Sequence, residues 1–384
     1  MNYTTIDNLP VLPENYKKEV LENVDWSKIE SQMLSCERAF VNGLIRFYKP
    51  KNVIEVGVAQ GGGSVTILNA IMDLHESTLT SIDLLESILN ENGESRSVGE
   101  DVYRVFDPHL IPGRWNLITG KDPSEVMGML QKNFDFMVLD TAHVHPIESL
   151  NFLSVLPYLN DGAIVVLHDT MLHFQKGFST SLATRILYSA VAAHKREPEM
   201  QSEANNIAAF QVTPVTREYI TNVFEALFLP WGLYPDARVM ASLTKLFKEH
   251  YSDSLLKKFE AAANLNNTLF ASGFGSNEID LSNIPKNAIF YGAGLRLRSL
   301  ISIYEQSNNT FSFTIWDQNP LIKEINGHPV SVPDFETKAR DGQMVIITVL
   351  NETVAAEVRA KLEPLGYKVY HGIESDAAYY KTTS

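Results

Sequence analysis

Two segments of the sequence place acidic and histidine side chains directly after apolar runs. FDFMVL is followed by DTAHVH, which holds Asp140 and His143, and GAIVVL is followed by HDT, which holds His168 and Asp169. Apolar runs of this length, bounded by turn-forming residues, are typical of buried parallel strands. Because the carboxyl ends of parallel strands meet at one edge of a sheet, we expect these four side chains to converge there.

Two carboxylates and two imidazoles at one point have two chemical uses. They can hold a divalent cation through oxygen and nitrogen ligands. They can also supply a general base near neutral pH, in which case His143 takes the proton while Asp140 or Asp169 orients the substrate. Each histidine taken singly could instead be a hydrogen-bonded structural residue, and His145, next to Pro146, could be only a turn residue.

A glycine-rich segment, VIEVGVAQGGGS, precedes this cluster and leads from an apolar run into a helical pattern. Glycine lets a ligand approach the backbone closely, and the start of a helix supplies free N–H groups. The spacing is not that of the G-x-G-x-x-G phosphate motif. Glu55 at the strand end would repel a pyrophosphate but would suit a cationic or hydroxyl-bearing ligand. The alternative is a tight turn without a ligand.

The elements that must position these residues alternate along the chain. Strand-like runs and helical patterns that follow one another predict a doubly wound, Rossmann-like α/β fold with right-handed connections. The polar segment 88–113 interrupts the alternation, and we expect a loop or lid there. The predicted strands are 53–58, 79–85, 115–120, 134–142 and 162–169, and the predicted helices between them are 64–74, 123–131 and 147–159.

The motif E-x-G-x-x-x-G-G-G-S resembles motif I of the class I S-adenosylmethionine-dependent methyltransferases, over roughly residues 50–170. The resemblance implies that Asp83 holds the ribose hydroxyls and that Asp122 lies near the adenine. Both acids could instead be simple helix caps. The loop residues that the resemblance assigns to the cofactor are Glu55, Gly57, Gly61, Gly62 and Ser64.

The pattern D-x-x-H followed by D-G-A-I-V-V-L-H-D resembles the methyltransferases that modify sugars and small hydroxylated metabolites, with Thr141 where that group has glycine. It implies O-methylation of a hydroxyl on a sugar-derived or other polar small molecule, with Asp140, His143 and Asp169 as catalytic residues. Related enzymes bind magnesium at these strand ends, which implies Asp140, His168 and Asp169 as ligands of Mg²⁺. N-methylation of a similar substrate stays open, because the fold does not choose the acceptor.

The composition narrows the classes of partner. A net charge of -14 disfavours nucleic acid, whose phosphates require a basic surface. No stretch is long and apolar enough to span a bilayer, and no signal peptide is recognisable, so we expect a cytoplasmic protein with no membrane partner. The single cysteine, Cys36, lies in a helical pattern, and we expect a buried thiol. The expected partner is a small molecule, a sugar or nucleotide-sugar among the options, and a homo-oligomer is possible.

A second α/β pattern follows the linker-like segment 270–286. A strand runs into the glycine turn YGAG, and the next strand ends at Asp317. This unit is similar to small Rossmann-like units of bacterial glycan-modifying enzymes. It leaves two alternatives open, a ligand site, as in an NAD- or nucleotide-sugar-dependent enzyme that uses the GAG turn, and a structural or dimerisation module. A non-catalytic binding module with a degenerate methyltransferase fold is a further alternative for the chain. The predicted domains are a methyltransferase domain (1–175), a helical segment that completes it (176–280) and a Rossmann-like domain (281–384).

Overall fold

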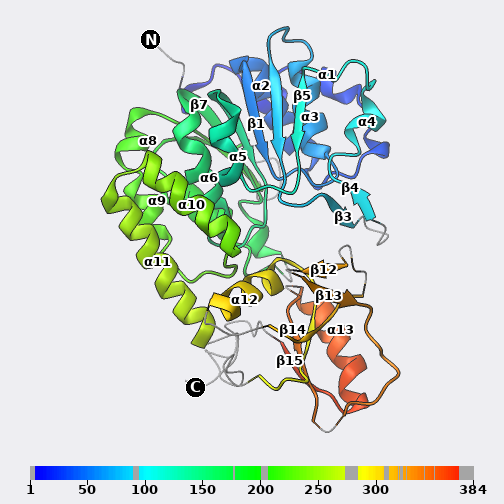
Figure 1. Ribbon diagram of the computed structural model, residues 1–384. Coiled ribbons are helices and arrows are strands. Elements are labelled where there is room, and N and C mark those ends of the chain that lie inside the picture. Colours follow the sequence, from blue (N-terminus) through cyan, green and yellow to red (C-terminus); the bar gives the residue numbers. More distant parts are fainter. Residues whose placement is uncertain are drawn as a thin grey trace. The chain divides into compact units, whose positions relative to one another are not determined.

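The computed structural model contains α/β units in both halves of the chain (Figure 1). It describes residues 5–89, 95–175, 178–199, 206–272, 284–306, 311–318, 320, 323–325, 327–340, 342–349 and 351–371. The described residues of the first unit fall within Met1–Gln175, Ser179–Leu229 and Ala241–Lys258, and those of the second within Lys176–Phe178, Pro230–Met240 and Phe259–Ser384. The predicted domain limits at 175 and 280 stay a proposal.

The strands of the first unit are β1 (Asn52–Val56), β2 (Thr78–Ile82), β3 (Ser87–Leu89), β4 (Ser95–Ser97), β5 (Trp115–Ile118), β6 (Phe134–Leu139), β7 (Leu159–His168), β8 (His194–Arg196) and β9 (Ile207–Gln211). The helices up to residue 272 are α1 (Lys18–Glu22), α2 (Ser35–Tyr48), α3 (Gly62–Ile71), α4 (Val102–Val105), α5 (Pro123–Leu130), α6 (Ile147–Val155), α7 (Ala183–Ala190), α8 (Pro214–Glu218), α9 (Thr221–Ala226), α10 (Ala237–His250) and α11 (Asp253–Ser272).

Seven strands form one sheet in the order β5-β2-β1-β6-β7-β9-β8. The first five of these are parallel, and β9 and β8 continue the sheet in antiparallel fashion. The parallel strands end level with one another, since Val56 is paired with Ile82 and with Leu139, and Leu139 with Leu167. The predicted α/β class and the five predicted parallel strands are confirmed.

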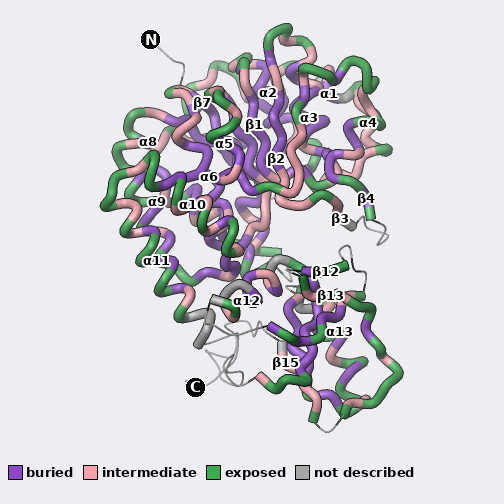
Figure 2. The backbone as a smooth tube through the Cα atoms, viewed as in Figure 1, coloured by how far each residue is buried: buried purple, intermediate pink, exposed green. Residues whose placement is uncertain are grey.

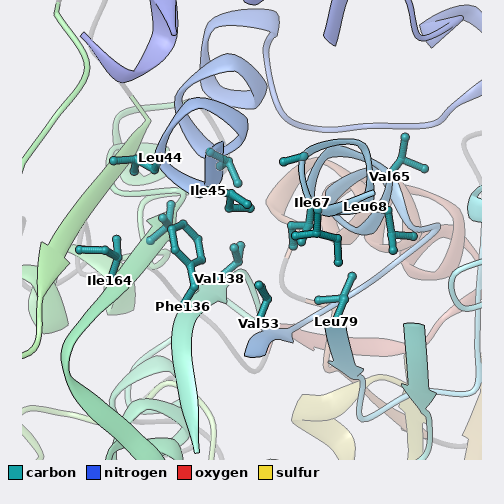
Figure 3. Packing of buried hydrophobic residues seen from close by; sticks show 14 of the residues in the cluster. Leu44, Ile45, Val53, Val65, Ile67, Leu68, Leu79, Phe136, Val138 and Ile164 are labelled. Atoms are coloured by element: carbon teal, nitrogen blue, oxygen red, sulfur yellow. The ribbon is translucent and has the colours of Figure 1, made fainter. Parts of the chain in front are cut away.

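Helices α2 and α3 pack on one face of this sheet, where their apolar side chains meet those of the strands (Figure 3). Leu44 and Leu68 belong to the same buried cluster as Val53 and Phe136, all 1% exposed or less. Alternate strand residues such as Met137 point to the other face and are equally buried. The central strands are thus buried on both sides (Figure 2), which explains their continuous apolar runs.

Two expectations for the first unit are wrong. The segment 88–113 is not only a loop: β3 and β4 form an antiparallel hairpin, and α4 follows it. β4 alternates between exposed and buried residues and is only three residues long. The sequence therefore contains no apolar run that would predict this strand. Cys36 is exposed, because it occupies a helix position next to the buried Glu37 but faces away from the core. No described helix is long and apolar enough to cross a membrane.

The second unit contains β10 (Ile289–Tyr291), α12 (Leu295–Gln306), β11 (Thr314–Trp316), β12 (Glu324–Ile325), β13 (His328–Ser331), β14 (Met344–Ile347), α13 (Glu352–Leu362) and β15 (Lys368–His371). Its sheet has the order β12-β13-β11-β10-β14-β15, with every pair parallel except β12–β13. The five parallel strands repeat the third-second-first-fourth-fifth order of the first sheet.

The glycine turn of the second unit also repeats that of the first. Gly292 has φ +107° and donates its N–H to the carbonyl of Trp316 at 2.8 Å, as Gly57 donates to Ile82 at 2.9 Å. Asp317 accepts from the N–H of Ala293 at 2.7 Å. The second unit is therefore a smaller α/β sheet built on the same local plan. Its predicted Rossmann-like function stays a prediction.

Candidate active site

The glycine loop joins β1 to α3 at the carboxyl edge of the first sheet. Gly57 has φ +87°, and a Cβ atom there would lie 1.7 Å from the carbonyl oxygen of Asp140. Gly61, with φ +107°, is the N-cap of α3, and a Cβ at Gly62 would lie 2.7 Å from Ser31. The loop therefore packs tightly against its own surroundings, and glycine is required at these positions by the chain itself.

Glu55 lies inside the sheet, 1% exposed, immediately before the loop. Its Oε2 accepts hydrogen bonds from the Ser64 hydroxyl at 2.5 Å and from the Ser81 hydroxyl at 2.6 Å. Burial raises the pKa of Glu55 to about 8, the two serine hydrogen bonds oppose this, and the negative charges of Asp140 and Asp83 add to the rise. Glu55 at the end of β1 and Ser64 in α3 are thus joined by a hydrogen bond.

Asp83 follows β2 and braces the glycine loop. Its Oδ2 accepts from the N–H groups of Val58 at 2.8 Å and Ala59 at 3.1 Å, and its Oδ1 accepts from Leu85 at 2.8 Å. Asp122 has the helix-cap role that was its alternative interpretation. It is the N-cap of α5, and its Oδ1 accepts from the Ser124 N–H at 2.9 Å.

Asp140, His143 and Asp169 converge beside the loop, at the ends of β6 and β7. Nε2 of His143 lies 3.0 Å from Oδ2 of Asp169 and 3.7 Å from Oδ1 of Asp140. One ligand atom from each of the three residues lies within 4.8 Å of the others, an arrangement that could hold a metal ion. His143 and Asp169 have φ of +60° and +61°. Left-handed backbone at non-glycine residues is strained, and such strain concentrates at functional sites.

His168 lies deeper in the protein than the sequence suggested. It is 1% exposed, and its Nε2 lies 3.2 Å from Oε2 of Glu37 on α2. Its Nδ1 lies 3.3 Å from Asp140 and 3.4 Å from Asp169. Burial alone would lower the pKa of His168, but the carboxylates of Asp140, Asp169 and Glu37 raise it well above its ordinary value. Of the predicted metal ligands Asp140, His168 and Asp169, His168 contacts the two acids from the buried side. The three groups that could share a metal ion are instead Asp140, His143 and Asp169.

The pKa of Asp140 depends on its burial and on the neighbouring histidines. Burial raises the pKa of Asp140, but the positive charge of His168 and its hydrogen bond outweigh burial, and the pKa is lowered overall. Asp140 is thus held as a carboxylate. Such a group orients or binds a cation well and accepts a proton poorly.

Three site residues were missed from the sequence: Glu37, Glu148 and Asn206. Oε1 of Glu148, on α6, accepts hydrogen bonds from the Thr141 hydroxyl at 3.0 Å and from the His143 N–H. Asn206, just before β9, donates to Oδ1 of Asp169. Glu37 and Asn206 are far in sequence from the residues that they contact, and Glu148 lies on the helix after the motif. No local sequence pattern therefore identifies them.

His145 does not belong to this cluster. It is 4% exposed, and burial lowers the pKa of His145 to about 4. The peptide bond between His145 and Pro146 is cis.

The comparisons with known proteins bear on the same part of the chain. Residues 54–170 match the family model Methyltransf_24, which is described as a methyltransferase domain. This segment is therefore a methyltransferase domain, and it spans the glycine loop and the cluster of Asp140, His143 and Asp169. The predicted methyltransferase class is confirmed for this segment. No curated protein matches the sequence.

Several solved structures are similar to the chain. The O-methyltransferase TomG from Streptomyces achromogenes, involved in tomaymycin synthesis and solved with S-adenosylmethionine, is 15% identical, with 47% of this chain and 81% of that chain covered and a TM-score of 0.36. An O-methyltransferase from Bacillus cereus is 14% identical, with 50% and 89% covered and a TM-score of 0.35. The methyltransferase PaMTH1 from Podospora anserina is 11% identical, with 51% and 85% covered and a TM-score of 0.36. Similarity this low identifies neither substrate nor site residues.

Proposed function

We propose that the methyltransferase domain binds S-adenosylmethionine at the glycine loop and methylates a hydroxyl group of a polar small molecule, sugar-derived or similar. One observation carries the proposal. The glycine loop after β1 packs directly against Asp140 after β6, so the loop and the cluster of Asp140, His143 and Asp169 share one edge of the sheet. A methyl donor and an acceptor hydroxyl bound at these two places would be neighbours, and proximity supplies much of the acceleration in such transfers.

The chemistry of the loop fits this cofactor. Residues 53–64 contain no lysine or arginine, and Asp83 lies beside the loop at the end of β2. Such a set of side chains suits a cationic ligand with hydroxyl groups better than a pyrophosphate. Glu55, Gly57, Gly61, Gly62, Ser64 and Asp83 would hold the cofactor, and Asp122, as a helix cap, would support the adjacent loop. S-adenosylmethionine supplies a methyl group already activated on a sulfonium.

The acceptor side fits a divalent cation held by Asp140, His143 and Asp169. Nε2 of His143 faces the two carboxylates, and its Nδ1 lies 3.8 Å from the buried Oε1 of Glu148. Oε1 of Glu148 accepts from the backbone N–H of His143, which fixes the position of this residue. A bound cation supplies Lewis acidity toward the acceptor hydroxyl. The mixed oxygen and nitrogen set suits Mn²⁺ as well as the predicted Mg²⁺.

A metal-free arrangement is the alternative. Its support is the 3.0 Å contact between Nε2 of His143 and Asp169. In this arrangement His143 takes the proton of the acceptor hydroxyl while Asp169 stabilises the resulting imidazolium. The methyl group passes to the hydroxyl oxygen, so the bond from carbon to sulfur breaks as the new bond from carbon to oxygen forms.

Calorimetric titration with S-adenosylmethionine, and separately with NAD, tests the cofactor. We expect the wild type to bind S-adenosylmethionine and the Asp83→Ala variant to bind it at least tenfold more weakly. Asp135→Ala is the matched control, because Asp135 also accepts from two backbone N–H groups, those of Lys51 at 3.0 Å and Asn52 at 3.1 Å, but at the amino end of the sheet. Binding of NAD without any binding of S-adenosylmethionine would refute the proposal.

Transfer of a labelled methyl group to a panel of sugars, nucleotide-sugars and amines tests the acceptor. We expect transfer to a hydroxylated compound, and loss of transfer in Asp169→Asn. Chelation with EDTA followed by addition of Mg²⁺ or Mn²⁺ separates the two arrangements. Activity that is lost with EDTA and restored by the cation supports the cation site, whereas activity that EDTA leaves unchanged supports His143 as the base. Transfer to amines only would overturn O-methylation.

A further inference from the structure

Helix α2 brings a buried carboxylate into the candidate site from outside the matched methyltransferase segment. Oε2 of Glu37 accepts a hydrogen bond from the N–H of Leu34 at 2.7 Å and lies 3.2 Å from Nε2 of His168. Glu37 is 2% exposed and His168 is 1% exposed. The match begins at residue 54, so the segment 54–170 does not by itself contain all the groups that contact the site.

His168 connects Glu37 to both acids of the cluster. Its other ring nitrogen, Nδ1, lies 3.3 Å from Oδ2 of Asp140 and 3.4 Å from Oδ2 of Asp169. One side of the ring therefore faces Glu37, and the opposite side faces the two aspartates. Within the described part of the chain, the contacts of these two nitrogens are with the three carboxylates. An imidazole placed in this way cannot also contact a substrate through either nitrogen without giving up a contact with a carboxylate.

The two aspartates need such support. The side chain of Asp140 is 22% exposed at the edge of the sheet, and its Oδ2 lies 3.3 Å from Nδ1 of His168. Asp169 has φ +61°, a conformation that is uncommon outside glycine. On its far side Asp169 is held by Asn206, but the oxygen that faces His143 and Asp140 is the one that His168 contacts.

We propose that Glu37 and His168 form a buried positioning pair, which holds the carboxylates of Asp140 and Asp169 in the orientation that the acceptor side of the reaction requires. The proposal rests on the proposed function and extends it to residues before the matched segment. Glu37 fixes the His168 ring, and the ring fixes the two carboxylates. Neither member touches the substrate, and His168 is not a metal ligand.

Crystal structures of the full-length wild type and of Glu37→Ala test the positioning directly. We expect the His168 ring to turn in Glu37→Ala and at least one of the two aspartates to leave contact with Nδ1. In Glu37→Gln, whose side-chain oxygen can still accept from His168, we expect the contacts to survive. Unchanged positions of His168, Asp140 and Asp169 in Glu37→Ala would overturn the proposal. If Glu37→Ala does not fold, His168→Asn provides the same test from the other member of the pair.

Titration of each protein with Mn²⁺ shows whether the pair matters for function. We expect Glu37→Ala to bind Mn²⁺ at least tenfold more weakly than the wild type, the loss typical of groups that orient metal ligands, with partial rescue in Glu37→Gln. Glu14→Ala is the matched control: Glu14 is also buried, 5% exposed, and accepts a distant backbone N–H, that of Glu199, at 2.8 Å.

The outcomes distinguish a failure of the positioning pair from a failure of the proposed cation site. Equal losses of Mn²⁺ affinity in Glu37→Ala and Glu14→Ala would show a general effect on stability and overturn the positioning role. A wild type that binds no Mn²⁺ would refute the proposed cation. The crystal structures would still decide the pair.

Discussion

The raised pKa of Glu55 makes a quantitative prediction about stability. The pKa rises from an ordinary 4.5 to about 8 in the folded protein, chiefly because the carboxyl is buried. The folded state therefore binds the proton of Glu55 more tightly than the unfolded state does. Between these two pKa values the unfolded chain releases this proton while the folded chain keeps it, so the free energy of unfolding falls as the pH rises.

The size of the effect follows from the shift. A difference of 3.5 pH units, at about 1.4 kcal/mol per unit, amounts to about 5 kcal/mol lost between pH 4.5 and pH 8. Glu55→Gln removes the titration and nearly preserves the shape. The new amide group lacks an acceptor, so we expect the variant to be about 1–3 kcal/mol less stable than the wild type at pH 5. At pH 8 we expect it to be the more stable protein, because only the wild type has lost the contribution of the proton.

Urea denaturation of both proteins at several pH values between 5 and 8 measures this difference. Other groups titrate in the same range, but they are common to both proteins and largely cancel in the comparison. The expected result is a pair of stability curves that cross. Curves that stay parallel within about 1 kcal/mol would refute the reasoning, since they would mean that Glu55 is ionised in the folded protein at neutral pH.

Three further predictions concern glycine, a loop-bracing acid and a buried histidine. Gly57→Ala should lower the free energy of unfolding by more than about 4 kcal/mol or prevent folding, because its Cβ would lie 1.7 Å from a backbone oxygen. Gly113→Ala is the control, since Gly113 has a similar φ of +80° but open space around it. This variant should lose about 1–2 kcal/mol in the same urea assay. Asp83→Asn should keep part of the S-adenosylmethionine affinity that Asp83→Ala loses, since an amide oxygen still accepts from the loop; equal affinities in calorimetry would contradict this. Burial lowers the pKa of His145 from 6.5 to about 4. As the pH falls from 6.5 to 4, the free energy of unfolding of the wild type should fall by up to about 3 kcal/mol, because the unfolded chain takes up the proton first. His145→Gln should reduce this pH dependence in urea denaturation.

Much of the fold and part of the site could be predicted from local pattern. The largely apolar runs before Gly57, Asp83, Asp140 and His168 predicted parallel strands, because strands buried on both faces are mostly apolar. Once the strands are parallel neighbours, residues directly after them must lie along one edge. This is why the sequence predicted the meeting of Asp140, His143 and Asp169, which the structure places within contact distance.

What the sequence could not predict depends on contacts between distant residues. Glu37 is 131 positions from His168, and its local pattern is that of an ordinary helix start. From the sequence, His168 was therefore predicted to be a ligand of Mg²⁺ and His143 to be the general base. Only the tertiary structure shows that His168 is buried between Glu37 and Asp169. The side chain of His143 is 17% exposed and contacts Asp169 from the other side.

The same reason explains the roles of Asp122 and Asp83. Local sequence permits both a cap and a ligand contact at each, and only the partners found in the fold distinguish them: Asp122 binds its own helix, whereas Asp83 reaches back to the glycine loop of the preceding strand. The sequence by itself determined the strands, the turns and the types of chemistry at their ends. The tertiary structure decided which side chains face each other, because burial and pairing depend on elements far apart along the chain.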